Sequence, residues 1–238
     1  MRGRLVAVEG ASAAGKTALV RAAARELGWR PLAEAYDRLD PAPSLEFGSP
    51  RELLLLEGTL LAEEVRRYRE ARGLCARGFT VVSDTGFLGP VTYTRGLVAL
   101  GRAPESVARS LERSARSLVR RGALGLPDLT VYLVTTVAER TARARSDRGR
   151  HPAALAPRHE AVSRFERRDL AGLLPRTLPG RFRTLRASSG LRALLPPLRR
   201  LVERASATPA SRKEALAVLS LLRRSGRERH RGIAGANR

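Results

Sequence analysis

The stretch from Gly10 to Thr17 constrains the fold of this chain more than any other part of the sequence. It reads Gly-Ala-Ser-Ala-Ala-Gly-Lys-Thr and fits the pattern G-x-x-x-x-G-K-[ST] at every position. A short apolar run, Leu5–Val8, precedes it, and a helical pattern over Lys16–Leu27 follows. A glycine-rich turn between a buried strand and a helix is typical of a site whose backbone N–H groups surround phosphate oxygens.

This loop predicts that the chain binds a nucleoside triphosphate. The Lys16 ammonium group would reach the β- and γ-phosphates, and the Thr17 hydroxyl would take a place on Mg²⁺. ATP and Mg²⁺ are therefore the expected cofactors. The residues expected to contact the nucleotide are Gly10, Ala11, Ser12, Ala13, Ala14, Gly15, Lys16, Thr17 and Ala18.

Strand-like and helical patterns alternate along the chain. Strands are expected over residues 5–8, 31–33, 79–83, 129–134 and 182–185. Helices are expected over residues 16–27, 50–72, 91–100, 106–121, 138–148, 157–174, 191–205 and 211–224. This alternation predicts an α/β fold of three layers, a P-loop NTPase fold in which helices cover both faces of an about five-stranded parallel sheet.

Two parts of the chain are distinguished by composition. A kinase-like domain is expected over residues 1–205, with a lid around 140–156. A basic C-terminal helix and tail are expected over 206–238, with the tail frayed from residue 226.

The formal net charge of +22 comes almost wholly from arginine, because only two of the 45 basic residues are lysines. Such an excess is typical of nucleic-acid binding, but a genomic preference for arginine codons would produce it equally. From Arg176 onward, 16 basic residues stand against 3 acidic ones. We expect only weak, non-specific nucleic-acid binding through this part, since aromatic side chains for base stacking make up 4% of the chain.

Cys75 is the only cysteine, so no disulfide can form within the chain, and a cytoplasmic location is expected. No apolar run approaches the ~20 residues that a membrane-spanning helix needs, so no membrane partner is expected.

Three carboxylates follow predicted strands at the sheet edge where ligands of such folds bind: Glu9, Glu34 and Asp84. Asp84 ends an apolar strand and is expected to hold the metal together with Thr17; the alternative is a cap on the next turn. Glu34 is the candidate general base for an acceptor hydroxyl, although a surface acid would fit equally well. Glu57 lies on the leucine stripe of the helix over 50–72, where a buried carboxylate needs an arginine or a substrate as its partner.

Five arginines crowd the helix expected over 138–148 and the loop after it: Arg140, Arg143, Arg145, Arg148 and Arg150. Because a guanidinium group forms bidentate contacts with phosphate, we expect an arginine-bearing lid over the transferred phosphoryl group. Arg145 and Arg148 are the lid residues expected to act in catalysis. An ordinary solvated helix face is the alternative in a chain so rich in arginine.

Together these segments resemble the thymidylate kinase and deoxynucleoside kinase group. The resemblance rests on Val8–Gly10 leading into the phosphate loop, on Asp84, on Pro127–Leu133 and on Glu139-Arg140. It implies Mg²⁺-ATP as the phosphoryl donor, an arginine-rich lid and a homodimer.

The resemblance also implies roles for particular residues. Glu34 resembles the glutamate that acts on the acceptor hydroxyl in that group. Two positions depart from the pattern. Glu57 is the nearest match to a glutamine that recognises the base, and Asp84 is followed by Thr85 where the group has arginine.

The leading prediction is a phosphotransferase that moves the γ-phosphoryl group of ATP to a small acceptor, a nucleoside or a nucleoside monophosphate. Ser12–Lys16 also resembles chloramphenicol-type phosphotransferases, so an antibiotic- or metabolite-modifying kinase is the first alternative. A nucleic-acid-binding P-loop NTPase would use the basic C-terminus. A GTPase switch ranks last, because the chain lacks an Asn-Lys-x-Asp segment for guanine.

Overall fold

The computed structural model describes residues 2–44, 46–146, 157–187, 190–206 and 208–236. The strands in these ranges form one five-stranded parallel sheet in the order β2-β3-β1-β4-β5. They are β1 (Leu5–Gly10), β2 (Arg30–Leu32), β3 (Val81–Asp84), β4 (Leu129–Val134) and β5 (Phe182–Arg186). The α/β fold expected from the sequence is confirmed, with every expected strand present.

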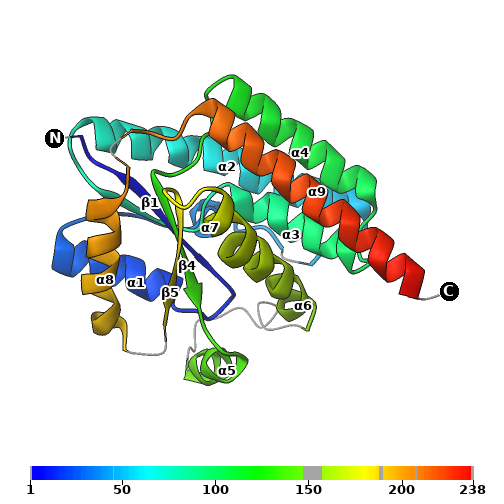
Figure 1. The fold of residues 1–238 in the computed structure, drawn as a ribbon. Coiled ribbons are helices and arrows are strands. Elements are labelled where there is room, and N and C mark those ends of the chain that lie inside the picture. The colour runs from blue at the N-terminus through cyan, green and yellow to red at the C-terminus, as the bar shows by residue number, and fades with distance from the viewer. Residues whose placement is uncertain (1, 45, 147–156, 188–189, 207, 237–238) are drawn as a thin grey trace.

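One face of the sheet is covered by α1 (Lys16–Leu27) and α8 (Leu191–Arg204), which lie side by side (Figure 1). Their apolar residues pack on the central strands in one core cluster that includes Val6, Leu19, Val131 and Leu198. All four side chains are almost fully buried, so this core fixes the direction in which α1 leaves the phosphate loop.

The other face is covered by a thicker layer of helices (Figure 1). It contains α2 (Pro50–Ala76), α3 (Leu88–Ala99), α4 (Glu105–Arg120), α7 (Leu174–Thr177) and α9 (Arg212–Ala236). Three further segments lie between strands in the chain. A 3₁₀ turn η1 (Tyr36–Arg38) follows β2, and α5 (Val137–Ser146) and α6 (Pro157–Glu166) follow β4.

The helix expected over 157–174 is interrupted by a π-helical segment, η3 (Arg167–Leu173). Pro175 lacks the N–H group that would continue the regular α-helical ladder, and the N–H group of Leu174 bonds back to the carbonyl of Asp169 instead. The wider turn keeps Asp169 and Leu170 buried.

The C-terminal helix α9 packs against α3 and α4 (Figure 1). Its buried residues Ala215, Val218, Leu219 and Leu222 belong to the same core cluster as residues of α3 and α4. The helix continues to Ala236, beyond residue 226 where the tail was expected to begin. Residues 227–231 are mostly arginine and glutamate, which are good helix formers, and they continue the helix past the weaker Gly226.

The Pro127-Asp128-Leu129 segment lies at the opposite end of the sheet from the phosphate loop. The Asp128 carboxylate accepts a hydrogen bond of 2.8 Å from the Leu5 N–H group and one of 2.9 Å from Arg72. This segment therefore ties β4 to the start of β1 and to α2, which is a structural role. Among the described residues, no helix is both long and apolar enough to cross a membrane.

Candidate active site

The phosphate loop turns sharply between β1 and α1. Gly10 has a φ of 152° and Gly15 a φ of 97°, and Ala13 between them has a φ of 62°. A Cβ atom on Gly10 would lie 3.1 Å from the carbonyl oxygen of Leu133, so both backbone freedom and close packing favour glycine there. Gly15 has no side chain with which to cap α1, and the first turn of this helix has no acidic residue. The N–H groups at this end are therefore left for an anion.

Lys16 and Thr17 begin α1 and lie over the end of β3. The Lys16 ammonium group donates a hydrogen bond of 3.0 Å to the Gly10 carbonyl, so it lies across the loop. The Thr17 hydroxyl donates to Oδ2 of Asp84 at 2.5 Å. The strand β3 thus delivers its terminal carboxylate directly to the residue that follows the loop lysine.

Asp84 has a free oxygen that fits a divalent cation. Its side chain is almost fully buried, and Oδ1 has no hydrogen-bond partner among the described atoms. A buried carboxylate oxygen left without a partner is costly, and Mg²⁺ prefers oxygen ligands such as this one and the Thr17 hydroxyl. In the described ranges no group of three or more His, Cys, Asp or Glu residues is placed to hold a metal. An Mg²⁺ ion here would therefore depend on substrate phosphates and water for its other ligands.

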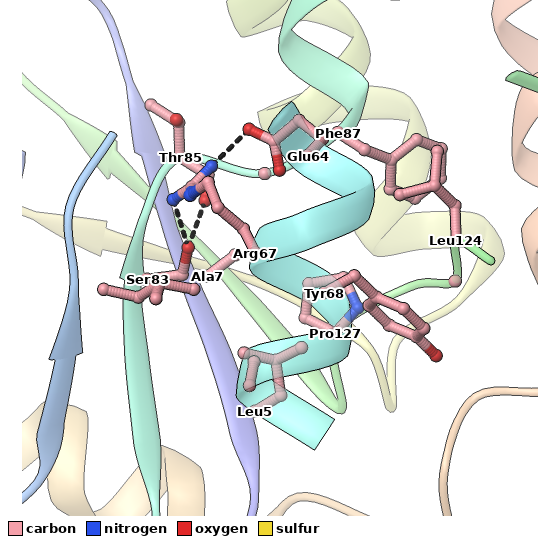
Figure 2. A pocket seen from close by; sticks show the side chains of 14 residues that line it. Leu5, Ala7, Glu64, Arg67, Tyr68, Ser83, Thr85, Phe87, Leu124 and Pro127 are labelled. Carbon is pink, nitrogen blue, oxygen red and sulfur yellow. Dashed lines mark hydrogen bonds and ion pairs between the residues drawn. The ribbon is translucent and has the colours of Figure 1, made fainter. Parts of the chain in front are cut away.

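Arg67 of α2 contacts this end of β3 (Figure 2). Its guanidinium group donates to the Ser83 hydroxyl and to the backbone carbonyl of Asp84, each at 2.6 Å, and forms an ion pair with Glu64. Burial raises the pKa of Glu64, and the Arg67 charge opposes that rise. The arginine holds in place the backbone that carries the candidate metal ligand, next to Thr85 with its φ of 61°.

The cavity in Figure 2 runs beneath Arg67 toward Tyr68 and Leu5. Its volume of about 30 Å³ accommodates only one or two water molecules. It is therefore a gap under the site, and an acceptor of nucleoside size does not fit there.

Glu34 follows β2 and is half-buried. Burial raises its pKa, while the nearby charge of Lys16 opposes the rise and that of Asp84 adds to it. Glu9, at the end of β1, has a pKa raised well above its usual range, mainly by burial. Residues from the ends of β1, β2 and β3 thus meet around Lys16.

Two more carboxyl groups extend this cluster away from the loop. Glu166 ends α6, is hydrogen-bonded to the Thr92 hydroxyl, and has a pKa raised by burial to about 7. The charge of Lys16 lowers this pKa, and the charge of Glu34 raises it. Glu57 on α2 is 3% exposed, and burial together with the Glu166 charge raises its pKa to about 8.

The arginines expected in the lid lie in different settings. Arg143 donates to the backbone carbonyls of Ala14 at 2.7 Å and Ala187 at 2.6 Å, so it ties α5 to the phosphate loop. Arg145 is exposed on α5. Arg148 and Arg150 lie outside the described residues, as does the lid beyond residue 146.

A polar cavity of about 130 Å³ lies between the phosphate loop and α6. Ala11 and Tyr132 line it on the side of the sheet, and Arg140 and Arg167 line it on the side of α5 and η3. Arg164 of α6 lines it as well, and three guanidinium groups make this cavity suitable for an anionic group.

No family model matches the chain, and no curated protein does either. The deoxyadenosine kinase from M. mycoides with bound dATP matches in structure with a TM-score of 0.63 and 14% sequence identity, over 85% of this chain and 100% of that one. Thymidylate kinase from Candida albicans matches with a TM-score of 0.63 and 16% identity, over 85% and 92%. The fold is that of the thymidylate and deoxynucleoside kinases.

Within this kinase fold, the structure brings together Lys16, Thr17, Asp84 and Glu34 from the expected set, and it leaves Arg145 at the surface. Sequence reasoning missed three residues of the cluster: Glu64, Arg67 and Glu166. The spacing of Glu57 and Glu64, seven residues apart on α2, was a usable signal, because it places both on one helix face. Glu166 had no such signal, since its position depends on how α6 packs.

Proposed function

We propose that the protein is a phosphotransferase that moves the γ-phosphoryl group of Mg²⁺-ATP to a nucleoside or a nucleoside monophosphate. The observation that carries the proposal is the hydrogen bond between Thr17 and Asp84, which sets a loop hydroxyl beside a buried carboxylate with a free oxygen. The kinase fold and the acid next to the loop support the same activity.

The loop and Lys16 would bind the phosphates. The N–H groups around Gly15 and the ammonium group of Lys16 are placed to neutralise negative charge that develops as the phosphoryl group is transferred. Thr17 and Asp84 would hold Mg²⁺. When bound, this ion would neutralise negative charge on the nucleotide phosphates.

Glu34 would act on the acceptor. With a nucleoside as acceptor, its ionised carboxylate accepts the proton of the acceptor hydroxyl while that oxygen bonds to the γ-phosphorus and the bond to the β-phosphate oxygen breaks. ADP keeps the electron pair of the broken bond. The location of Glu34 near Lys16 and Asp84, at the end of the neighbouring strand β2, supports this role.

The test is phosphoryl transfer from labelled ATP to nucleosides and nucleoside monophosphates. We expect transfer to at least one of them, and a loss of at least about 100-fold in Lys16→Ala, because its charge acts mainly in the transition state. Lys213→Ala is the matched control, since the second lysine is exposed on α9. Turnover unchanged in a folded Lys16→Ala protein, or no transfer to any of these acceptors, would contradict the proposal.

A further inference from the structure

Arg143 of α5 contacts the phosphate loop itself. One terminal nitrogen of its guanidinium group donates to the Ala14 carbonyl at 2.7 Å, and the other donates to the Ala187 carbonyl at 2.6 Å. Hydrogen bonds from a charged donor are roughly twice as strong as bonds between neutral groups. Because both acceptors are backbone carbonyls, this arginine acts on the conformation of the chain around the loop.

The Ala14 carbonyl lies just before the hydrogen-bond ladder of α1. That ladder begins one residue later, where the Leu19 N–H group donates to the Gly15 carbonyl at 2.9 Å. The Ala14 N–H group bonds within the loop to the Ala11 carbonyl at 3.1 Å, and Ala14 is 1% exposed. A buried carbonyl outside a helix needs a donor from elsewhere in the chain, and Arg143 supplies one.

The bond from Arg143 fixes the direction of the next N–H group, that of Gly15. The peptide between Ala14 and Gly15 is trans, so its C=O and N–H groups point to opposite sides. Since the carbonyl is held toward α5, the Gly15 N–H group points away from α5, and it donates to no acceptor within the described ranges. It is one of the N–H groups at the start of α1 that are left for a phosphate oxygen.

Without this bond the peptide between Ala14 and Gly15 could turn over. Gly15 has a φ of 97°, and glycine adopts positive and negative φ values about equally readily. No side chain caps α1 at this residue. If the peptide turned over, its carbonyl oxygen would face the bound phosphates, and repulsion would replace a hydrogen bond.

The bond to Ala187 fixes the orientation of the guanidinium group. Ala187 follows β5, and its N–H group donates to the Val134 carbonyl of β4 at 3.0 Å. Ala187 and Ala14 belong to one core cluster, and each is 1% exposed. A planar guanidinium group that bridges two fixed carbonyls has a defined orientation, which an ammonium group does not reproduce.

We propose that Arg143 is a positioning residue for the phosphate loop: it holds the Ala14 carbonyl against the end of β5 and so directs the Gly15 N–H group at the nucleotide phosphates. This inference rests on the proposed function, which supplies the triphosphate as ligand. The role differs from that of an arginine covering the transferred phosphoryl group, because the terminal nitrogens of Arg143 bond to backbone carbonyls. Its effect should therefore depend on the phosphates of the nucleotide and not on the base or sugar.

The experiment compares ATP with inorganic tripolyphosphate, which has neither base nor sugar. Calorimetric titration in the presence of Mg²⁺ measures both dissociation constants. We expect Arg143→Met to raise both by the same factor, at least about 10-fold, the size of one hydrogen bond to a charged group. Arg143→Lys keeps the charge but loses the planar group, and it should raise both equally, by at least about threefold. Arg192→Met, exposed on α8, is the control and should leave both constants unchanged.

The amide proton of Gly15 reports the positioning directly. Saturating tripolyphosphate should move its NMR signal downfield in the wild-type protein, because the N–H group then donates to a charged oxygen. In Arg143→Lys the movement at saturation should be clearly smaller. An arginine that only contacted the phosphates would leave this movement unchanged.

Loss of ATP affinity without loss of tripolyphosphate affinity would place Arg143 at the base or sugar and would overturn the inference. So would unchanged affinities, or an unchanged Gly15 signal, in a folded Arg143→Lys protein. This variant keeps a long cationic side chain, so the test stands even where Arg143→Met does not fold. A wild-type protein that binds tripolyphosphate but transfers phosphate to no nucleoside or its monophosphate would overturn the proposed acceptor class alone. One that does not bind tripolyphosphate would overturn both.

Discussion

Arg67 and Asp84 are joined by a hydrogen bond of 2.6 Å from the guanidinium group to the backbone carbonyl of the aspartate. The chain has Thr85, not an arginine, directly after this acid. The guanidinium group that supports Asp84 comes instead from α2, the helix that directly precedes β3 in the chain. Its other bonds go to Ser83 and Glu64, so α2, β3 and the turn after β3 are fixed together.

We expect Arg67→Leu to lower the free energy of unfolding by about 3–5 kcal/mol, because the buried Glu64 loses its partner. Urea denaturation measures this loss. The double variant Arg67→Leu/Glu64→Leu should regain much of the stability, since no unpaired charge remains. A single variant as stable as the wild-type protein would show that Glu64 is not ionised next to Arg67.

Asp84→Asn should raise the Mg²⁺ concentration needed for half-maximal activity by at least about 10-fold, because an amide is a weaker ligand than a carboxylate. Initial rates over a range of Mg²⁺ concentrations measure this change. Glu34→Gln should leave the Mg²⁺ requirement unchanged while it lowers kcat. An equal shift of the Mg²⁺ requirement in both variants would place Glu34 at the metal.

As the pH is lowered, activity with a hydroxyl acceptor should begin to fall at a higher pH than it would if the glutamate had its ordinary pKa. Burial raises the pKa of Glu34, and only the ionised form accepts a proton, so kcat/KM is lost as the pH falls through this raised pKa. The pH profile of kcat/KM measures the midpoint. Glu34→Gln should have a much lower rate, and its pH profile should lack this loss of kcat/KM at acid pH.

The pH dependence of stability should reveal the protonated state of Glu57. Its folded pKa of about 8 lies above the usual value of 4.5, so its contribution to stability is present at acid pH and is lost as the pH rises through about 8. The Tm of the wild-type protein should therefore fall more between pH 6 and 9 than the Tm of Glu57→Gln. Parallel Tm curves for the two proteins would show that Glu57 ionises at its ordinary pKa.

Retention of nucleic acid should be weak and should depend on salt rather than on sequence. Some of the basic C-terminal region is used in packing: Arg181 pairs with Glu214, and Arg212 donates to the carbonyl of Arg120 at 3.4 Å. Binding of short duplex oligonucleotides at increasing salt tests this, with affinity expected to fall by roughly 0.9 log units per tenfold salt for each phosphate contacted. Tight binding to one sequence at physiological salt would contradict it.

The phosphate loop and the sheet were predictable because their signals are local. The pattern from Gly10 to Thr17 specifies its own turn, and apolar runs such as Leu129–Val134 specify buried strands. Parallel strands then bring their carboxyl ends to one edge, which is why Glu34 and Asp84 were found by their place after a strand.

The helical half of the site was less predictable because it depends on packing between distant segments. Nothing near Glu166 in the sequence indicates that α6 will approach α3 at Gly96. The Pro127-Asp128-Leu129 segment carried part of the resemblance to the kinases, yet its aspartate bonds to Leu5 and Arg72 at the far end of the sheet. A segment that resembles a family motif can thus stabilise the fold without taking part in the reaction.

The position of α9 has a consequence for the order in which the protein is built. Of the five strands of this sheet, β1 is synthesised first, yet it lies in the middle, and both its edges are paired only after β4 has been synthesised. Val218, Leu219 and Leu222, which complete the core against α3 and α4, are synthesised only after all five strands of the sheet. During translation the apolar faces of α3 and α4 therefore remain open to solvent, and to chaperones, until α9 has been synthesised.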